Sequence, residues 1–195
     1  MFIGILALQG DFFEHANTIN LIGEKYKYVK SSNDLDDISA LILPGGESTA
    51  MNIIQRNQNL FAGIKTMIAE GLPVIGTCAG AILLAKNITN DDMYNLDVLD
   101  IQIERNAYGR QNDSFEDLVS INDMSKEKYC FIRAPKIVSI GEDVQIIAKL
   151  KEEIVGVRQD NIVAFTFHPE LNPSPNYLLW LSNFLSKEEQ NVRTL

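Results

Sequence analysis

Three apolar runs of strand length in the first half of the chain each end at a break that contains glycine. The runs span residues 2–8, 39–43 and 72–75. Between them, residues 12–22 and 60–69 carry apolar side chains at spacings of three and four, which predicts helices. Continuous apolar runs are typical of parallel strands that helices cover on both faces. The sequence therefore predicts an α/β fold with a mostly parallel, doubly wound sheet of the flavodoxin-like type and flanking helices.

The second half of the chain changes character. Short apolar segments with turns between them predict strands over residues 118–121, 129–133, 137–140, 144–150, 154–158 and 162–167. That density predicts antiparallel additions to the sheet. A last helix is predicted over residues 177–185, and the polar residues 187–195 are expected to fray. Because no linker or internal repeat interrupts the pattern, residues 1–195 are predicted to form a single domain.

Composition and charge exclude several classes of function. The 195 residues carry a formal charge of -9, which argues against a basic surface for nucleic acid. No apolar run reaches the roughly 18–20 residues that a membrane span needs, and the apolar start of the chain lacks a basic leader. With two cysteines and two histidines, neither a disulfide framework nor a zinc site is expected. We expect a cytoplasmic protein that binds no membrane, no metal and no cofactor.

Cys78 stands in Gly76-Thr77-Cys78-Ala79-Gly80, directly after the third apolar run. A nucleophile between glycines at the end of a strand is typical of a nucleophile elbow, a sharp strand-to-helix turn that exposes the side chain above the sheet. The amino end of a helix beginning near Ala79, together with an adjacent imidazole, would favour the thiolate. Cys130 lies inside the apolar segment 129–132 and is predicted to be a packed core residue. Cys78 is therefore the predicted nucleophile.

His168 follows the apolar run 162–167 and precedes Pro169, which ends ordinary strand pairing. Glu170 lies two residues on, the spacing at which extended side chains face the same way, so its carboxylate could accept the second imidazole N–H. We predict that Cys78, His168 and Glu170 form a catalytic triad. The other histidine, His15, is predicted to be structural.

Two glycines, Gly45 and Gly46, follow the second apolar run. The segment 44–49 could be merely a turn and a helix cap, since Ser48 or Thr49 can cap a helix. Paired glycines also let backbone N–H groups approach a ligand, as an oxyanion hole or a carboxylate-binding loop requires, and we favour this role. A substrate with an α-carboxylate would also need one or two arginines, and the candidates are Arg105, Arg110 and Arg133.

The Gly-Thr-Cys-Ala-Gly motif and the downstream His-Pro-Glu resemble those of the class I, triad-type glutamine amidotransferases. Within that group, further segments resemble the glutaminase subunits of pyridoxal 5'-phosphate (PLP) synthase, namely residues 9–15, 44–49, 105–111, 113–115, 131–135 and 167–171. The resemblance covers essentially the whole chain. Departures from the pattern, such as Glu104 and Asn112, do not touch the triad.

The resemblance implies that Cys78 attacks the side-chain amide of L-glutamine, forms a γ-glutamyl thioester and releases ammonia. His168 would act as general base and acid, and Glu170 would orient it. Backbone N–H groups near Gly46 and of Ala79 would form the oxyanion hole. The glutamine-binding residues that the resemblance implies are Gly46, Glu47, Ser48, Arg105, Ile132 and Arg133.

The resemblance also implies a partner. Ammonia would pass through a tunnel to a separate synthase subunit that is a (β/α)₈ barrel and assembles PLP, within a hetero-oligomeric complex. The glutaminase would be weak until the synthase docks and aligns the oxyanion-hole peptide. Gly45-Gly46 is therefore expected to be a conformational switch as well as a binding loop.

Two other interpretations stay open. The chain could be the glutaminase of another ammonia-channelling pair, such as the one that serves histidine biosynthesis, although residues 9–15 and 105–111 argue against it. The fold also hosts thiol sensors that hydrolyse no amide. The neighbouring His168 and Glu170 argue against a sensor, because a sensor needs no general acid for a leaving amine.

Overall fold

Five parallel strands form one half of the larger of two sheets. The structure, a computed structural model, describes residues 1–8, 10–46, 58–89, 95–105, 114–122 and 124–186. The parallel strands lie in the order β2-β1-β3-β4-β12, and every neighbouring pair is parallel. Their bounds are β1 (Phe2–Leu6), β2 (Tyr26–Val29), β3 (Ile38–Leu43), β4 (Val74–Thr77) and β12 (Ile162–Phe165). Because the strands are parallel, the loops that follow them gather along one edge of the sheet.

Antiparallel strands extend this sheet beyond β12 to nine strands in the described part of the chain. The order continues β11-β10-β7-β8. These strands are β7 (Phe115–Ile121), β8 (Glu127–Phe131), β10 (Gln145–Leu150) and β11 (Glu153–Gln159). A second sheet contains β5 (Ala85–Ile88), β6 (Leu99–Glu104) and β9 (Lys136–Ile140).

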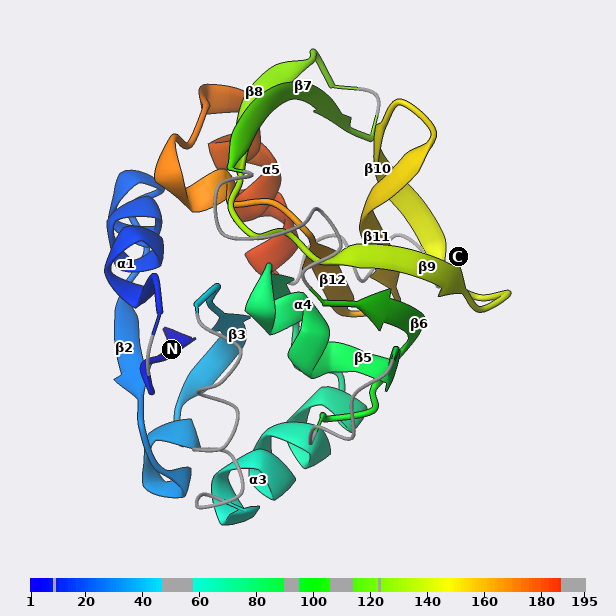
Figure 1. Ribbon diagram of the computed structural model, residues 1–195. Coiled ribbons are helices and arrows are strands. Elements are labelled where there is room, and N and C mark those ends of the chain that lie inside the picture. The colour runs from blue at the N-terminus through cyan, green and yellow to red at the C-terminus, as the bar shows by residue number, and fades with distance from the viewer. Residues whose placement is uncertain (9, 47–57, 90–94, 106–113, 123, 187–195) are drawn as a thin grey trace, which may run out of the picture.

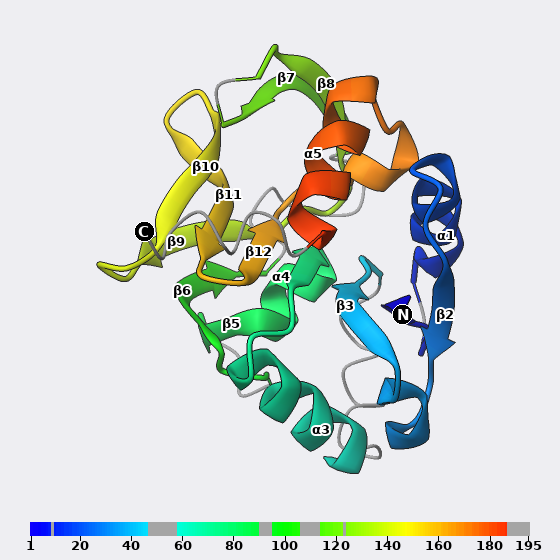
Figure 2. The same cartoon turned by 180° about the vertical axis from the view of Figure 1, so that it is seen from behind.

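Helices lie on both faces of the parallel half, as Figures 1 and 2 show from opposite sides. Within the described residues the α-helices are α1 (Phe12–Leu21), α3 (Gln58–Ala69), α4 (Ala79–Leu84) and α5 (Pro175–Leu185), and the 3₁₀ helices are η1 (Ser32–Leu35) and η3 (Pro169–Leu171). Local sequence explains where α5 begins. Ser174 accepts a hydrogen bond from the Tyr177 N–H, and Pro175 occupies the first helical position, where its missing N–H has no consequence.

Successive residues of β3 show how the two helical layers use the sheet. Ala40 and Ile42 pack in one apolar cluster with side chains of α1 and α5, whereas Leu41 and Leu43 pack in a second cluster with α3 and α4. All four side chains are almost fully buried. A strand buried on both faces needs apolar residues at every position, which is why the sequence shows a continuous apolar run here.

The structure confirms the predicted α/β fold with a parallel sheet, flanking helices and antiparallel additions. Three strands that the sequence did not predict are β2, β5 and β6. Strand β2 lies at the edge of the sheet and is only half buried, so it carries the mixed sequence Tyr-Lys-Tyr-Val. In β6 buried and half-buried residues alternate, and in β5 a single residue is buried. The expected frayed tail 187–195 lies outside the described residues.

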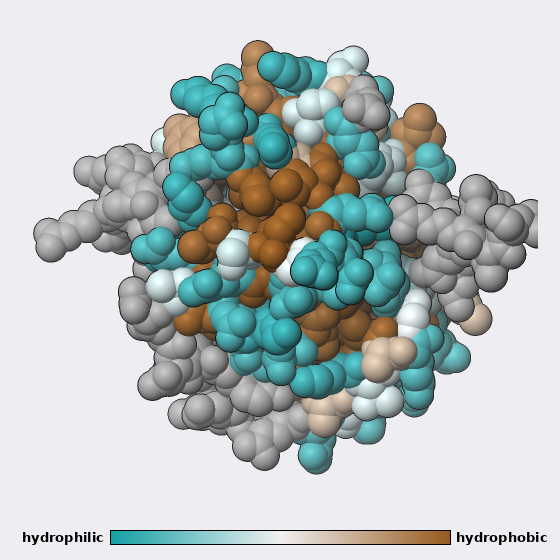
Figure 3. Space-filling model, turned by 90° about the vertical axis from the view of Figure 1, so that its right-hand side faces the viewer, coloured by the Kyte–Doolittle hydropathy of each residue, from teal (hydrophilic) through white to brown (hydrophobic). Residues whose placement is uncertain are grey.

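The side of the molecule that carries β9, β10 and β11 faces the viewer in Figure 3, where apolar side chains gather near the centre. Val138 on β9 and Ile146 on β10 are among the exposed large apolar residues. Exposed apolar side chains are common on protein surfaces and do not by themselves identify a partner. Across the described residues, no helix has the length and apolar character needed to cross a membrane.

Candidate active site

The candidate catalytic residues follow three neighbouring parallel strands. β3 pairs with β4, and β4 pairs with β12 in a register that places Thr77 opposite Phe165. Gly45 follows β3, Cys78 follows β4 directly, and His168 follows β12 by three residues. The loops that follow these three strands therefore lie together at one edge of the sheet.

Cys78 occupies a strained elbow between β4 and α4. Its φ is 48° and its ψ is -104°, a region that residues with a side chain rarely adopt. Its backbone N–H donates to the Phe165 carbonyl at 2.8 Å, which ties the elbow to β12. Such strain is typical of a nucleophile held above a sheet.

The two glycines of the motif are required by close packing. A Cβ on Gly80 would lie 1.9 Å from the carbonyl oxygen of Leu43, and a Cβ on Gly76 would lie 2.6 Å from the backbone of Gly80. Real Cβ atoms do not approach other atoms so closely. The glycines therefore let α4 start against the end of β3, and this packing fixes the position of Cys78 between them.

His168 is held by its backbone and by its ring. Its N–H donates to the Cys130 carbonyl at 2.9 Å, which attaches it to the end of β8. Its Nδ1 lies 2.8 Å from Oε1 of Glu170. The predicted extended geometry is wrong here, because residues 169–171 form the 3₁₀ helix η3; the turn still brings the carboxylate to the ring. Nε2 is buried without a hydrogen bond to any described residue, and the His168 side chain interacts with that of Cys78.

Cys130 is only half buried, so its predicted place in the core is wrong. Its Sγ lies 3.4 Å from Oε1 of Glu116, which is near the surface. Burial and the Glu116 carboxylate raise the pKa of the Cys130 thiol. Cys130 is thus a poor nucleophile, although its backbone supports His168.

Of the predicted glutamine-binding residues, Ile132 lies at the nucleophile. Its carbonyl oxygen is 3.7 Å from Sγ of Cys78, within reach of a weak S–H···O contact. Arg133 follows with a positive φ of 45° and an exposed side chain. Arg105 directly follows β6 and is half buried. Glu47, Ser48 and Arg110 lie outside the described residues.

The glycine loop after β3 is fixed by hydrogen bonds on both sides of Gly45. The Gly45 N–H donates to the Thr77 hydroxyl at 3.1 Å, and the Gly45 carbonyl accepts from the Asp11 N–H at 3.2 Å. The Gly45 carbonyl and the Gly46 N–H belong to one planar peptide and point in opposite directions. The Asp11 contact therefore sets the direction of the Gly46 N–H. Ala79, the first residue of α4, offers a second N–H without an intrahelical partner.

Three residues that sequence reasoning did not place in the site contact the triad. Asp11 Oδ2 lies 3.3 Å from Nδ1 of His168. His15 Nε2 lies 3.4 Å from Oε1 of Glu170 and 3.1 Å from Oγ1 of Thr77. Thr77 Oγ1 in turn lies 3.5 Å from the same Glu170 oxygen. The signal was present in the sequence, because Asp11 and His15 belong to the segment 9–15 that follows β1.

Pairing keeps His168 and Glu170 charged in spite of their burial. Burial by itself would lower the pKa of His168, but interactions with Asp11, Cys78 and Glu170 raise that pKa above its ordinary value of 6.5. Burial would raise the pKa of Glu170, but His15 and His168 lower it below the ordinary 4.5. At neutral pH the pair is therefore an imidazolium and a carboxylate.

Asp11, His168 and Glu170 offer ligand atoms within 4.8 Å of one another, a spacing that could hold a metal ion. These atoms already pair among themselves, since Nδ1 lies 2.8 Å from one carboxylate and 3.3 Å from the other. A cation there would have to displace the imidazolium proton. The arrangement fits an acid–base site better than a metal centre.

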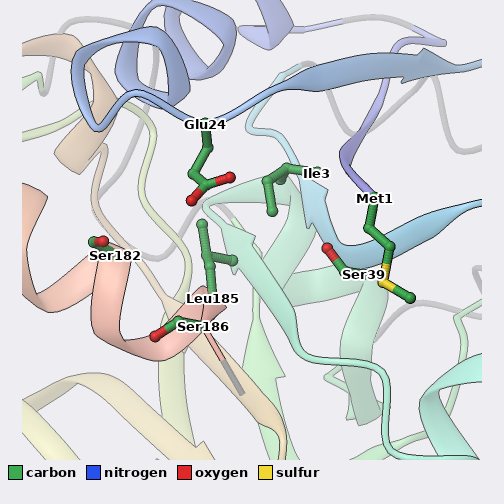
Figure 4. Close-up of a pocket in the computed structure, with 7 residues that line it drawn as sticks. All are labelled: Met1, Ile3, Glu24, Ser39, Ser182, Leu185 and Ser186. Carbon is green, nitrogen blue, oxygen red and sulfur yellow. The ribbon is translucent and has the colours of Figure 1, made fainter. Parts of the chain in front are cut away.

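A separate hollow lies at the opposite edge of the sheet, near the start of β1 and the end of α5 (Figure 4). Its volume is about 360 Å³, and its lining residues are Met1, Ile3, Glu24, Ser39, Ser182, Leu185 and Ser186. These residues include neither a cysteine nor a histidine. Cys78, His168 and Glu170 lie at the other edge of the sheet, where the parallel strands end.

The comparison with known proteins agrees with this geometry. Residues 5–184 match the SNO glutamine amidotransferase family. The chain belongs to the SNO glutamine amidotransferase family. Among relatives of this family, the pyridoxal 5'-phosphate synthase subunit PdxT of Caldicellulosiruptor bescii is 50% identical over 94% of this chain and 96% of its own length. The subunit PdxT of Thermosipho africanus is 43% identical over 96% of this chain and 100% of its own length.

Solved structures extend the agreement to three dimensions. A crystal structure described as a glutamine amidotransferase superposes with a TM-score of 0.88 at 38% identity, over 95% of this chain and 99% of that chain. A putative GMP synthase subunit of Thermoplasma acidophilum superposes with a TM-score of 0.67 at 16% identity, over 100% of this chain and 98% of that one. The second likeness shows that the fold is shared well beyond the SNO glutamine amidotransferase family.

Proposed function

We propose that this chain is the glutaminase subunit of a PLP synthase, and that it hydrolyses L-glutamine to L-glutamate and ammonia for use by a synthase subunit. One observation carries the proposal. In a member of the SNO glutamine amidotransferase family, a strained Cys78 at the end of β4 stands beside a His168–Glu170 pair at the end of the neighbouring β12. The assignment to PLP synthesis comes from the names of relatives whose matches cover nearly the whole chain.

In the proposed mechanism, Cys78 has already given its proton to Nε2 of His168, which makes that ring an imidazolium, and the Cys78 sulfur attacks the side-chain amide carbon of glutamine as a thiolate. Glu170 occupies Nδ1, so Nε2 is the nitrogen that exchanges protons with the thiol and the leaving group. His168 then donates its proton to the leaving nitrogen, the C–N bond breaks, and ammonia and a γ-glutamyl thioester result. Water, deprotonated by His168, attacks the thioester and releases glutamate, which returns Cys78 to the thiolate and His168 to the imidazolium.

The negative oxygen of each tetrahedral intermediate would be bound by the N–H groups of Gly46 and Ala79. The Gly45 N–H is already donated to Thr77 and cannot serve. A Gly46 N–H aimed by the Asp11–Gly45 contact is consistent with a loop that changes state when the synthase docks. A switch of this kind would prevent release of ammonia without an acceptor.

The glutamine backbone would be bound by residues around this edge. We assign Arg105 and the exposed Arg133 to the α-carboxylate, since guanidinium groups bind carboxylates in a planar, paired geometry. The Ile132 carbonyl, 3.7 Å from Sγ, and the loop residues Gly46, Glu47 and Ser48 would complete the substrate site. Ammonia would then pass to the (β/α)₈-barrel synthase subunit.

The test is ammonia release from L-glutamine by this chain alone and with the barrel-shaped synthase subunit, with Cys78→Ala as the blank. We expect a low rate alone, a strong increase with the partner and no turnover by Cys78→Ala. If the chain hydrolyses glutamine at a rate that the synthase does not change, the glutaminase activity is supported but the role in PLP synthesis is rejected. No hydrolysis in either condition would reject the glutaminase itself.

Covalent trapping gives an independent check of the nucleophile. A reactive glutamine analogue should modify Cys78, and excess glutamine should protect it. Cys130 is a matched thiol in the same chain, half exposed and with a raised pKa, so it should stay unmodified. Equal modification of both cysteines by a generic alkylator, without protection by glutamine, would favour a thiol sensor.

A further inference from the structure

His15 is buried at a place where a packing residue would normally be apolar. It lies on α1 with 1% of its surface exposed, and Ala16 and Ile19 are buried on the same helix. A buried imidazole without partners is unfavourable, so it is expected to have a hydrogen-bonding role. Its Nε2 faces two oxygens, Oγ1 of Thr77 at 3.1 Å and Oε1 of Glu170 at 3.4 Å.

The described residues that contact the Glu170 carboxylate all approach Oε1. His168 Nδ1, Thr77 Oγ1 and His15 Nε2 approach this one oxygen, at 2.8, 3.5 and 3.4 Å. Oε2 is buried and has no hydrogen bond to a described residue. The position of Oε1 relative to the His168 ring is thus fixed by the groups that share it.

Counting protons decides which tautomer of His15 fits. The Thr77 hydroxyl has one proton and already accepts from the Gly45 N–H. If Nε2 of His15 carried no proton, the Thr77 hydroxyl would donate to it, and Glu170 would lose both of these donors. If Nε2 carries the proton, His15 and Thr77 can both donate to the carboxylate. A buried carboxylate that stays ionised needs these donors.

The neighbouring Tyr177 adds no charge to this network. Tyr177, fully buried, has its pKa raised by burial and by the charge of Glu170, so its phenol stays neutral. Asp11 contacts His168, the other member of the ion pair. The donors to Oε1 therefore come from His168, Thr77 and His15.

We propose that His15 is a positioning residue that donates from Nε2 to Glu170 and, through Thr77, links the catalytic carboxylate to the oxyanion loop at Gly45. The inference rests on the proposed glutaminase function. It adds two residues from other elements, α1 and β4, to the machinery that orients His168. With Glu170 misplaced, His168 would lose its fixed tautomer, and the chemical step would slow more than substrate binding would weaken.

The test compares His15→Leu with His15→Gln in the complex with the synthase subunit. Leucine fills the space without a donor, whereas the glutamine amide can donate from nearly the same place as Nε2. We expect His15→Leu to lower kcat at least about tenfold with little change in KM, and His15→Gln to stay within about threefold of the wild type. A His15→Leu enzyme at the wild-type kcat, or equal losses in both variants, would overturn the proposal.

Thr77 gives a second pair in case His15→Leu does not fold. Thr77→Val keeps the shape and removes the hydroxyl, and Thr77→Ser keeps the hydroxyl. We expect Thr77→Val to lose at least about tenfold in kcat and Thr77→Ser to stay near the wild type. Loss in both, or in neither, would reject the hydroxyl link between Glu170 and Gly45.

Alkylation of Cys78 by iodoacetamide separates this inference from the function on which it rests. The rate is followed against pH by mass spectrometry on the Cys78 peptide, so that the second thiol, Cys130, does not interfere. The His15→Leu profile should shift in the same direction as that of Glu170→Gln, and the His15→Gln profile should match the wild type. An unshifted His15→Leu profile would overturn the positioning role. A wild type that alkylates normally but hydrolyses no glutamine would reject only the function.

Discussion

Asp11 and Glu170 approach the same nitrogen of His168 from different elements. Oε1 of Glu170 lies 2.8 Å from Nδ1, whereas Oδ2 of Asp11 lies 3.3 Å away with about a third of its side chain exposed. Nδ1 carries a single proton, which it donates to Glu170 because that contact is shorter and fully buried. Asp11 then acts on His168 through its charge, which solvent weakens.

Asp11→Asn should therefore have a much smaller effect than Glu170→Gln. We expect Asp11→Asn to lower kcat by less than about fivefold, because the contact is solvent-screened and its backbone bond to Gly45 is kept. Glu170→Gln should lower kcat by about 10²–10⁴-fold, since the His168 imidazolium loses its charged partner and the contact that orients its ring. Ammonia release with the synthase present measures both, and equal losses would identify Asp11 as an equal partner in the mechanism.

The buried pair should also make stability depend on pH. The lowered pKa of Glu170 gives stability that is complete above the unfolded value of 4.5 and is lost as pH falls below it. The raised pKa of His168 gives stability that is complete below the unfolded value of 6.5 and is lost as pH rises above it. The difference in melting temperature between wild type and Glu170→Gln should thus be largest between pH 4.5 and 6.5. A difference that does not change from pH 3 to 9 would contradict the ion pair.

Much of the fold was predictable because buried parallel strands have a distinctive pattern. β3, β4 and β12 are buried on both faces, so their apolar runs and glycine breaks could be read directly. Strand β2 could not, because an edge strand with one solvent-facing side needs only partial apolar character. The antiparallel half was predicted as strands, but their order in the sheet depends on contacts distant in sequence.

The roles of the triad could be proposed from motifs, whereas the roles of its supporting residues could not, although Asp11 and His15 stand in a segment that the resemblance had singled out. Cys78, His168 and Glu170 stand in short segments whose residue types carry the chemistry. His15 stands on a helix among apolar residues, and a lone histidine there is more often structural. Its contact with Glu170 spans 155 positions of the chain and arises only when α1 packs against η3. Sequence spacing carries no information about such a contact.

Gly10 and Gly71 give a matched test of the glycine loop. Both have a φ of +93°, so alanine introduces the same backbone strain at each. A Cβ on Gly10 would lie 1.8 Å from the Gly45 carbonyl oxygen, whereas a Cβ on Gly71 meets nothing within 4 Å. Gly10→Ala should therefore displace the Gly45-Gly46 peptide and lower synthase-activated kcat by about 10²-fold or more, the loss expected for one oxyanion donor.

Gly71→Ala should keep wild-type activity and lose only about 1–2 kcal/mol of stability from backbone strain. Kinetics of ammonia release and thermal unfolding of the two variants separate the effects. Alkylation of Cys78 should continue in Gly10→Ala, since the elbow itself is unchanged. Full activity in Gly10→Ala would show that the Gly46 N–H does not need the direction set by Asp11 and Gly45.

The strain at Cys78 predicts an unusual order of stability among inactive variants. A side chain in its backbone conformation carries about 1–3 kcal/mol of strain, which glycine would release. Glycine loses about 0.4–1 kcal/mol through the greater entropy of its unfolded chain and up to about 0.8 kcal/mol of methyl burial. At the middle of these ranges the released strain exceeds the losses, so Cys78→Gly should be at least as stable as Cys78→Ala.

Ala81, three residues on in α4 and fully buried, is the control for this order. It has no positive φ, so Ala81→Gly gains nothing from released strain and should lose about 1–2 kcal/mol from helix propensity and methyl burial. For a chain of this length, each kcal/mol moves the melting temperature by about 2–4 °C. Thermal unfolding of the three variants decides the matter. If Cys78→Gly fell below Cys78→Ala by as much as Ala81→Gly falls below the wild type, the elbow would store no strain, and the nucleophile would be positioned by packing alone.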